Sequence, residues 1–414
     1  MPEDSDALVN GALGGREQRV ALTVMRPLPE TQEAPEPDRG RRHGLRRVLH
    51  VCQPALPVLG IAAVAHVLVL LVAVAATYDS HIPVQRALYG WDAQWYLTIA
   101  HSGYPHVIPQ GQGSPAQSAL GFLPLLPALI WVMSEVLRVG TGVAGQIVTT
   151  LTGLSAAVMV WLLFRDDEGD EKARQGTTLM LFWPAAFVLA MVYSEGLFIT
   201  LVAGALLALR RRRWVWAGCL AALAPITDPV GLAIFVPCIF AAVVAIRQRR
   251  DWSSLAAPII APIGLLGFMA FMWSWTGTPF AWYIAQKRGW QYGAAPFWGI
   301  PRQFVEAVRE HLQNPNPDIK AVSTLVVLGL LIFMIRARPD PLYFAYVFSV
   351  LVLGASSGVV SWSPRLALRA FPLIVLAGAR LPRRWATPVI ATSGVLMAVV
   401  ATLAFGNSAN PFTP

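Results

Sequence analysis

The stretch GWDAQWYLTIAHSGY, residues 90–104, follows the first long apolar run of the chain and sets the carboxylate of Asp92 among tryptophans. The 414 residues are 55% hydrophobic and 13% charged, against about 25% charged in a typical soluble domain. Apolar runs long enough to cross about 30 Å of hydrocarbon recur along the chain. The sequence therefore predicts an all-α polytopic membrane protein, with Asp92 near a bilayer surface.

Apolar runs and the arginine groups between them define the predicted topology. The runs lie at about 58–77, 119–137, 142–164, 176–209, 214–246, 254–275, 321–335, 342–360, 366–379 and 386–405. The arginine groups lie at 210–213, 247–250, 336–338 and 380–384. All four groups can face the cytoplasm if 214–246 is a hairpin turning near Asp228-Pro229. This arrangement predicts about eleven membrane-spanning helices.

Two arrangements of residues 119–209 fit this topology. If 119–137 and 142–164 both cross, 165–175 is outside and 176–209 crosses once, although such a helix would span about 50 Å. If 119–137 is re-entrant or interfacial, 165–175 is inside and 176–209 is a hairpin. The prolines of 119–137 favour the second arrangement, and the acidic balance of 165–175 favours the first.

The remaining segments form a tail and two loops. Residues 1–50 are polar and lack periodicity, which predicts a disordered tail, and its arginines place it in the cytoplasm. Residues 51–414 form the membrane domain, with extracytoplasmic loops at 78–118 and 276–320; the first loop bears an amphipathic helix. Arginine greatly outnumbers lysine, which together with abundant Ala and Val indicates a GC-rich bacterial genome and hence a bacterial plasma membrane.

Acidic residues in the outer half are candidate site residues, and each has a structural alternative. Asp92 shares a helical face with Tyr96 and Ile99. It is either a general base or the solvated acid of an interfacial helix. Tyr193-Ser194-Glu195 interrupts an apolar run, which is typical of a cavity-facing acid or of a helix cap. Asp228 presents the same choice, and its position favours a cap or turn.

Two pairs of cations lie on the outer side, against the positive-inside trend. Lys287 and Arg288 follow the run at 254–275 and are suited either to a phosphate head group or to snorkelling toward lipid phosphates. Arg365 and Arg369 share a helical face at the outer end of two runs. That face can bind a lipid-linked phosphate or anchor the protein at the surface.

Several classes of function are disfavoured. The sequence has no HxxxH or HExxH motif and no glycine-rich phosphate loop, and its DxD match, Asp4-Ser5-Asp6, lies in the polar tail, so neither a metal, a nucleotide nor another cofactor is predicted. The net charge of +9 is concentrated in the arginine groups between apolar runs, which disfavours nucleic acid as a partner. His66 lies within the first apolar run and is predicted to be a packed core residue.

Short motifs in matching order resemble the PIG-V-like mannosyltransferases, membrane enzymes of the GT-C type. They are Trp91-Asp92 with Ile99-Ala100 and Gly103-Tyr104, Phe122-x-Pro124-Leu125-x-Pro127, Pro184-Ala185-x-Phe187, Tyr193-Ser194-Glu195, Pro279-Phe280 through Gln286 to Trp290, and Pro364-Arg365 with Phe371-Pro372. One departure is Thr227-Asp228-Pro229-Val230-Gly231, where the family tends to have a basic residue before the glycine. The tail also lies outside the resemblance.

The resemblance implies an inverting transferase that moves a sugar, mannose in particular, from a polyprenyl-phosphate donor at the extracytoplasmic face. The acceptor would be a glycolipid or a lipid-linked glycan. Asp92 would be the catalytic base, and Glu195 would orient hydroxyl groups or hold the loop bearing Asp92. The implied substrate-binding residues are Trp91, Trp95, Tyr96, Tyr193, Gln286, Lys287, Arg288, Trp290, Arg365 and Arg369.

Two other classes remain open. A transporter or lipid flippase would use Glu195 and Asp228 as coupling or substrate sites, although no internal repeat is found and the long outer loops favour a catalytic surface. A non-catalytic subunit that keeps the fold would account for the departure at Asp228.

Overall fold

The computed structural model describes residues 53–78, 83–290, 299–310, 315–356 and 363–406, and these form helices joined by irregular segments. In chain order the α-helices are α2 (Leu56–Tyr78), α3 (Val84–Leu88), α4 (Asp92–Ser102), α5 (Leu125–Leu137), α6 (Thr141–Glu168), α7 (Asp170–Leu181), α8 (Glu195–Arg210), α9 (Trp214–Leu223), α10 (Phe235–Arg249), α11 (Ala256–Ile260), α12 (Ile263–Thr276), α13 (Ala281–Gly289), α14 (Gly299–Glu310), α15 (Pro315–Ala337), α16 (Pro341–Ser356), α17 (Pro364–Arg369), α18 (Pro372–Arg380) and α19 (Arg383–Gly406). The predicted tail, 1–50, lies outside the described residues.

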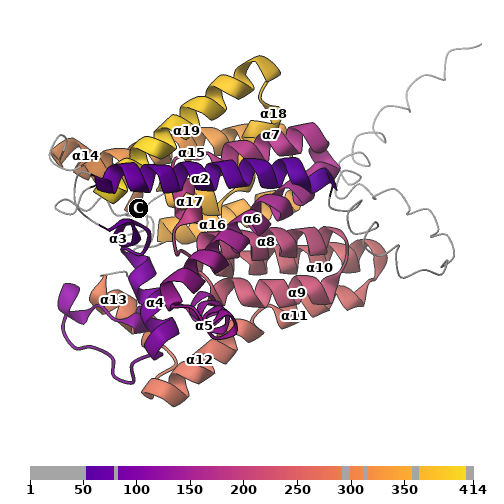
Figure 1. Ribbon diagram of the computed structural model, residues 1–414. Coiled ribbons are helices and arrows are strands. Elements are labelled where there is room, and N and C mark those ends of the chain that lie inside the picture. Colours follow the sequence, from indigo (N-terminus) through magenta and orange to yellow (C-terminus); the bar gives the residue numbers. More distant parts are fainter. Residues whose placement is uncertain (1–52, 79–82, 291–298, 311–314, 357–362, 407–414) are drawn as a thin grey trace, which may run out of the picture.

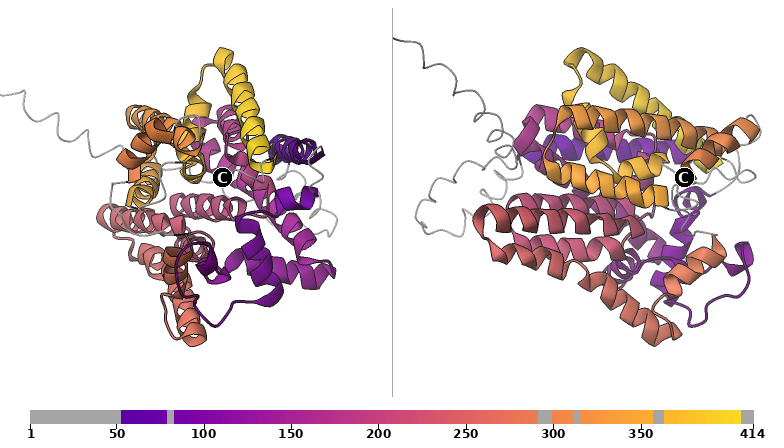
Figure 2. Two further views of the ribbon diagram at one scale, coloured as in Figure 1. Left: turned by 90° about the vertical axis from the view of Figure 1, so that its left-hand side faces the viewer. Right: turned by 180° about the vertical axis from the view of Figure 1, so that it is seen from behind.

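The long helices lie side by side along one direction (Figure 1). We call the end that carries α3, α4 and α13 the loop end, and the opposite end, where α8 and α10 finish in arginines, the arginine end. The left panel of Figure 2 views the bundle from the loop end, with α3 and α4 in front of the long helices. The site described below lies where these short helices meet the bundle.

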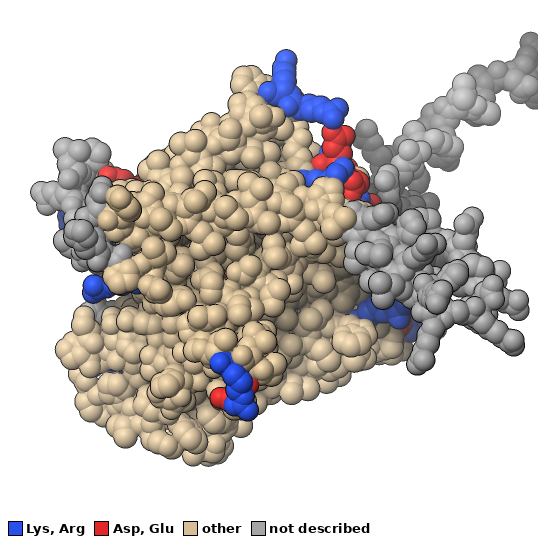
Figure 3. Space-filling view, in the orientation of Figure 1, with Lys and Arg blue, Asp and Glu red and all other residues tan. Residues whose placement is uncertain are grey.

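The apolar content is arranged as an integral membrane protein requires. Among the described residues, six helical stretches are long and apolar enough to cross a bilayer: Leu56–Tyr78, Thr141–Glu168, Pro229–Arg249, Trp252–Thr276, Asp318–Ala337 and Arg383–Gly406. Three shorter apolar helices accompany them, Leu125–Leu137, Trp214–Ile226 and Pro341–Ser356. The predicted number of about eleven spans is therefore not confirmed. One broad face of the molecule is almost free of charged side chains (Figure 3).

The structure separates the two predicted arrangements of residues 119–209. The run at 176–209 is not one helix, because α7 ends at Leu181 and α8 begins at Glu195. Asp167 near the end of α6 pairs with Arg210 at the end of α8, and Asp166 lies 3.5 Å from Arg211. The segment that follows α6 is thus at the arginine end, and 176–209 doubles back as the second arrangement requires.

The predicted hairpin at 214–246 is present. The indole Nε1 of Trp214, at the start of α9, donates to Asp251 just after α10 at 3.0 Å, so both ends of the hairpin meet at the arginine end. The chain reverses at Asp228, whose side chain accepts from the backbone N–H of Val230 at 2.9 Å and caps a short 3₁₀ helix, Pro229–Ile234. The turn interpretation of Asp228 is confirmed.

The apolar run at 366–379 is divided between two short helices, α17 and α18. α17 ends at Arg369 and α18 begins at Pro372. A proline has no backbone N–H to donate and is well suited to the first position of a helix, so Pro372 starts α18 instead of continuing α17. The break leaves α17 as a separate short helix that faces α8.

The amphipathic helix predicted in the first loop is α4. Tyr96, Ile99 and Ala100 are buried on its inner face, and Gln94 and Thr98 are exposed on the outer one. In the second predicted loop, 276–320, the described residues form α13, α14 and the start of α15. The side of the membrane that these loops occupy remains a prediction.

Candidate active site

Five charged side chains from four separate parts of the chain meet at the loop end. We call them the charged cluster: Asp92, Glu195, Asp228, Arg365 and Arg369. Arg365 Nη1 lies 2.9 Å from Asp92 Oδ2, and its Nε donates to Glu195 Oε1. Arg369 Nη2 lies 2.9 Å from the same Glu195 oxygen and 2.5 Å from Asp228 Oδ2. Asp228 is therefore both a turn residue and an ion-pair partner.

Burial divides the charged cluster into an inner and an outer part. The side chain of Glu195 is 0% exposed and that of Asp228 is 3% exposed. The guanidinium groups are nearly buried, whereas the Asp92 side chain is 28% exposed. Buried charges are tolerated when they are paired, and each of these is paired. Asp92 is the carboxylate that an incoming molecule can reach.

Local sequence explains why these side chains point at one another. Asp92 and Glu195 are the first residues of α4 and α8, where the helix dipole favours a negative charge. Ser363 caps α17 by accepting from the backbone N–H of Leu366 at 3.3 Å. Arg365 and Arg369, one turn apart in that short helix, then project on the same side and both contact Glu195.

Tyrosines surround the charged cluster and fix its geometry. The Arg365 guanidinium lies over the ring of Tyr193, 4.8 Å from its centroid, and the backbone N–H of Asp92 donates to the Tyr193 hydroxyl at 3.4 Å. Tyr96 donates its hydroxyl hydrogen to Ser194 Oγ at 3.3 Å. Burial raises the pKa of Tyr96, so its hydroxyl remains a donor well above neutral pH.

Trp91, which precedes Asp92, has an unusual backbone. Its φ of 49° lies in the left-handed region that few residues other than glycine adopt without cost. Its side chain is partly buried and packs against the apolar core. This conformation turns the chain from α3 into α4 and sets Asp92 at the start of α4.

The other predicted substrate-binding residues lie apart from the charged cluster. Trp95 stacks on Phe122 with ring centroids 5.8 Å apart and meets Trp290 edge-on at 5.6 Å. Gln286 donates to the Gly121 carbonyl, where a β-carbon on Gly121 would come within 2.9 Å of Trp290. These contacts fasten α13 to the loop before α5.

The two predicted cations of α13 are also outside the cluster. Arg288 donates to the carbonyl of Pro109 at 3.0 Å, and the Lys287 side chain is exposed. Within the described ranges, neither side chain contacts a member of the charged cluster. The cation that contacts Asp92 is Arg365, and Arg369 contacts Glu195 and Asp228.

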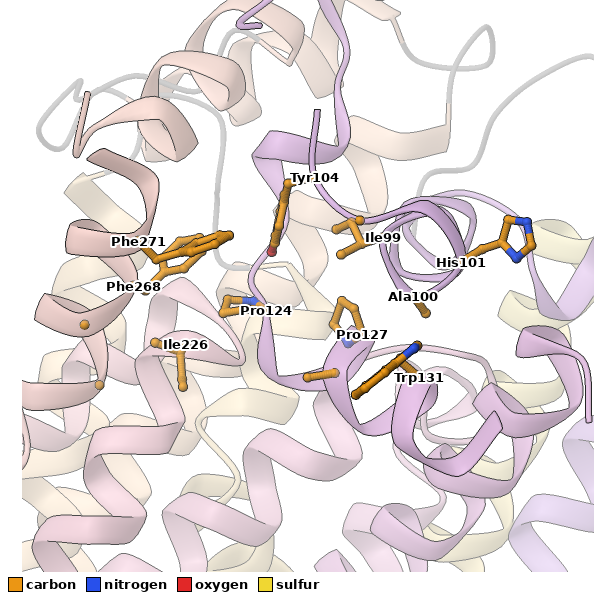
Figure 4. Close-up of a pocket in the computed structure, with 14 residues that line it drawn as sticks. Ile99, Ala100, His101, Tyr104, Pro124, Pro127, Trp131, Ile226, Phe268 and Phe271 are labelled. Atoms are coloured by element: carbon orange, nitrogen blue, oxygen red, sulfur yellow. The ribbon is translucent and has the colours of Figure 1, made fainter. Parts of the chain in front are cut away.

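An apolar groove of about 650 Å³ opens beside α4, α5 and α12. Sequence reasoning did not find it. Figure 4 shows Tyr104, Phe268 and Phe271 on one side of the groove and Trp131 on the other, with Pro124 and Pro127 along its floor. Ile99 and Ala100 of α4 also line it, so the helix that begins with Asp92 ends at the groove. The available signal was the prolines and glycines that line it, Pro124, Pro127, Gly264 and Gly267.

Metal coordination finds no support in the described part of the chain. No group of three or more His, Cys, Asp and Glu side chains there could hold a metal ion. The three carboxylates of the charged cluster are engaged by arginines instead. His66, predicted as a core residue, is buried with its Nδ1 3.2 Å from the carbonyl of Ala62.

Comparison with known proteins places this architecture. No model of a protein family matches the chain, and no curated protein matches it, so the resemblance to PIG-V-like enzymes gains no support there. Among solved structures it is similar to ArnT from Cupriavidus metallidurans bound to undecaprenyl phosphate, with a TM-score of 0.53 and 15% identity over 84% of this chain and 75% of that one.

A second similar structure is the apo oligosaccharyltransferase of Archaeoglobus fulgidus. Its TM-score is 0.52, with 12% identity over 86% of this chain and 56% of that one. The chain thus spans little more than half the length of the archaeal enzyme. At these identities the likeness concerns the fold alone. The chain has the fold that these two solved structures share.

Proposed function

We propose that the protein is an inverting glycosyltransferase that takes its sugar from a polyprenyl-phosphate donor. The observation that carries this proposal is the contact between an accessible carboxylate, Asp92, and Arg365, which shares the buried Glu195 with a second arginine, Arg369, within a GT-C fold. Sugar transfer from a lipid phosphate needs a base for the acceptor and cations for the departing phosphate. The charged cluster supplies both within one site.

In the proposed reaction a single displacement occurs at the anomeric carbon of the donor sugar. The acceptor oxygen forms the new bond while its proton passes to the Asp92 carboxylate. The bond from the anomeric carbon to the phosphate oxygen breaks, and its electron pair remains on the phosphate. Arg365 and Arg369 stabilise that charge, and their low-dielectric surroundings strengthen the effect.

Glu195 has a positioning role in this proposal. It is fully buried and accepts from both arginines through one oxygen, so it fixes the spacing of the two guanidiniums. The role as a direct hydroxyl ligand is less suited to a side chain with no exposed surface. Tyr193 supports the same arrangement from below Arg365, at 4.8 Å.

The apolar groove suits the hydrocarbon chain of the lipid donor. It is lined by aromatic and aliphatic side chains and lies at the end of the helix that begins with Asp92. ArnT, whose fold is similar, has been solved with undecaprenyl phosphate bound. A prenyl chain in the groove would bring its phosphate toward the charged cluster along α4, which is about 15 Å long.

Mannose as the sugar rests on the resemblance to PIG-V-like enzymes, as does a glycolipid or lipid-linked glycan as the acceptor. An extracytoplasmic site in a bacterial plasma membrane, with the N-terminus in the cytoplasm, is supported by arginines at the end opposite to the charged cluster. Of the aromatic residues proposed to surround the sugar, Trp91 precedes Asp92 and Tyr96 lies one turn further along α4, whereas Trp95 packs on Phe122 and Trp290 away from the charged cluster.

The direct test uses the purified full chain in liposomes. Radiolabelled polyprenyl-phosphate-mannose and a crude lipid extract serve as donor and acceptor, with the wild type beside Asp92→Asn. We expect labelled glycolipid from the wild type alone. Equal product from a folded Asp92→Asn variant would remove the assigned base. Movement of the donor across the liposome bilayer without any sugar transfer would instead favour a transporter or flippase.

A further inference from the structure

The charged cluster contains more negative than positive charge. Three carboxylates face two guanidiniums, which gives a formal charge of −1. A lipid phosphate brings further negative charge into a mostly buried site, where like charges repel strongly. Both arginines can therefore turn to a phosphate only if a carboxylate gives up its contact with one of them.

The geometry identifies the carboxylate that can leave. Glu195 is fully buried and binds both arginines, so it has no other polar environment to enter. Asp228 is 3% exposed and is also held by the backbone N–H of Val230. Asp92 is 28% exposed, and its carboxylate is held by Arg365 alone among the described residues. Asp92 can be separated from the cluster and hydrated.

The two arginines differ in how many of their donor atoms are free to bind a ligand. Arg369 has a buried Nε without a hydrogen-bond partner among the described residues, so it can donate to a ligand while it keeps Glu195 and Asp228. Arg365 already uses its Nε for Glu195 and its Nη1 for Asp92. Full engagement of Arg365 by a phosphate therefore competes with its pairing to Asp92.

We propose that Arg365 couples donor binding to release of the base. In the free protein Arg365 holds the Asp92 carboxylate; an arriving phosphate takes Arg365, and Asp92 becomes available to an acceptor hydroxyl. This inference rests on the proposed function and adds an order to it, with the donor binding before the acceptor is activated. Arg365 is thus both a phosphate ligand and the residue that keeps Asp92 occupied until a donor is present.

The test measures binding of a phosphate that cannot react. Farnesyl phosphate carries a prenyl chain and a phosphate but no sugar, and its dissociation constant is measured on the purified full chain in detergent micelles. Four proteins are compared: wild type, Asp92→Asn, Arg365→Ala and the double variant. Removing the competing carboxylate should tighten binding about fivefold to tenfold in Asp92→Asn, whereas Arg365→Ala should weaken it about tenfold or more.

The double variant separates the proposed exchange from a general charge effect. We expect Asp92→Asn to have no effect in the Arg365→Ala background, because the competition no longer exists. Equal tightening in both backgrounds would overturn the coupling, and so would unchanged or weaker binding by Asp92→Asn alone. Unchanged binding by Arg365→Ala would instead contradict the proposed phosphate site itself. Glu135→Gln, which neutralises an acid in an exposed pair with Arg138 on α5, is the matched control and should bind like the wild type.

Discussion

Two ionic clusters lie at opposite ends of the bundle, and they differ in how completely their hydrogen bonds are formed. At the arginine end, Arg210 pairs with Asp167 and lies 3.3 Å from Asp340. Its Nη1 also donates to the carbonyl of Leu163 at 2.9 Å and to the hydroxyl of Tyr343 at 2.8 Å. Tyr343 in turn donates to Asp167 at 2.8 Å. We call these five residues the arginine-end cluster.

The charged cluster is buried as deeply as the arginine-end cluster, but fewer of its buried polar atoms have hydrogen-bond partners. The side chains of Arg210 and Arg369 are both 13% exposed. Yet Glu195 Oε2 and Arg369 Nε are buried without a hydrogen-bond partner among the described residues, whereas no atom of the arginine-end cluster has that status there. Unsatisfied buried polar groups are rare in stable folds. This difference supports the proposal that the charged cluster binds a ligand, whereas the arginine-end cluster joins helices.

The largest expected effect comes from Asp92→Asn, which removes the proposed base and leaves the shape of the site. Transfer should fall by a factor of about 10² to 10⁴, the usual contribution of a general base. Initial rates at saturating donor measure this change. Asp340→Asn in the arginine-end cluster is the matched control and should keep its kcat. Comparable loss in both variants would erase the distinction between the clusters.

Arg210→Met tests the other side of the comparison. It leaves Asp167 and Asp340 without their shared cation, and breaking a buried ion pair costs about 3–5 kcal/mol, with the lower value expected because Asp167 is 29% exposed. Thermal unfolding in detergent should show a large drop in Tm, with transfer per folded molecule unchanged. Arg365→Met should lower Tm less, because Asp92 can turn to solvent and Glu195 keeps Arg369. The opposite ranking would contradict the assigned roles.

Gly267→Trp asks whether the apolar groove works with the charged cluster. Gly267 lines the groove, and an added β-carbon there meets no atom within 4 Å. The indole should occupy the groove and raise KM for a long-chain donor about tenfold, equal to about 1.4 kcal/mol of binding. A short-chain donor should be unaffected, and Gly267→Ala should behave like the wild type. An equal effect on both donors would argue for a general distortion.

Tyr96→Phe should have the smallest effect. It removes one hydrogen bond to Ser194, worth about 0.5–1.5 kcal/mol of unfolding free energy. Because burial raises the pKa of Tyr96, the unfolded state releases this proton before the folded state does as the pH rises. Wild-type stability should therefore fall above about pH 10, and the fall should be smaller in Tyr96→Phe. Unfolding midpoints at pH 8 and above measure the difference; identical pH dependence would contradict it.

Much of the fold could be predicted from hydropathy, because a helix that crosses the membrane must be apolar whichever helices it packs against. The hairpin turning at Asp228 followed from the arginine groups and Pro229. The break between α17 and α18 did not, because Phe371-Pro372 lies within a continuous apolar stretch whose helix ends depend on a single missing N–H. Residues 176–209 were ambiguous for the same reason, since hydropathy does not record where a helix stops.

Individual members of the charged cluster could be singled out from the sequence, but their partners could not. Asp92, Glu195 and the paired arginines stand out as charges in apolar surroundings. Nothing in the spacing of the chain reveals that Arg365 bridges residues 92 and 195, since that contact depends on how α4, α8 and α17 pack. Lys287 and Arg288 carry the same signal of charge, yet they lie apart from the charged cluster. A charged residue near a membrane surface is a candidate for a site, but only the packing of the helices shows which candidates lie together.

Trp91 has a consequence for efforts to stabilise this protein. A residue other than glycine at φ 49° stores about 1–3 kcal/mol of backbone strain, which Trp91→Gly would relieve. Selection for heat resistance alone should therefore enrich small, turn-forming residues at position 91 and lose the indole beside Asp92. Such variants would be more stable to heat, but the N-terminus of α4 would be poorly ordered. Thermal screens on this chain need a transfer assay beside them, because this strained backbone lies next to Asp92, the proposed base.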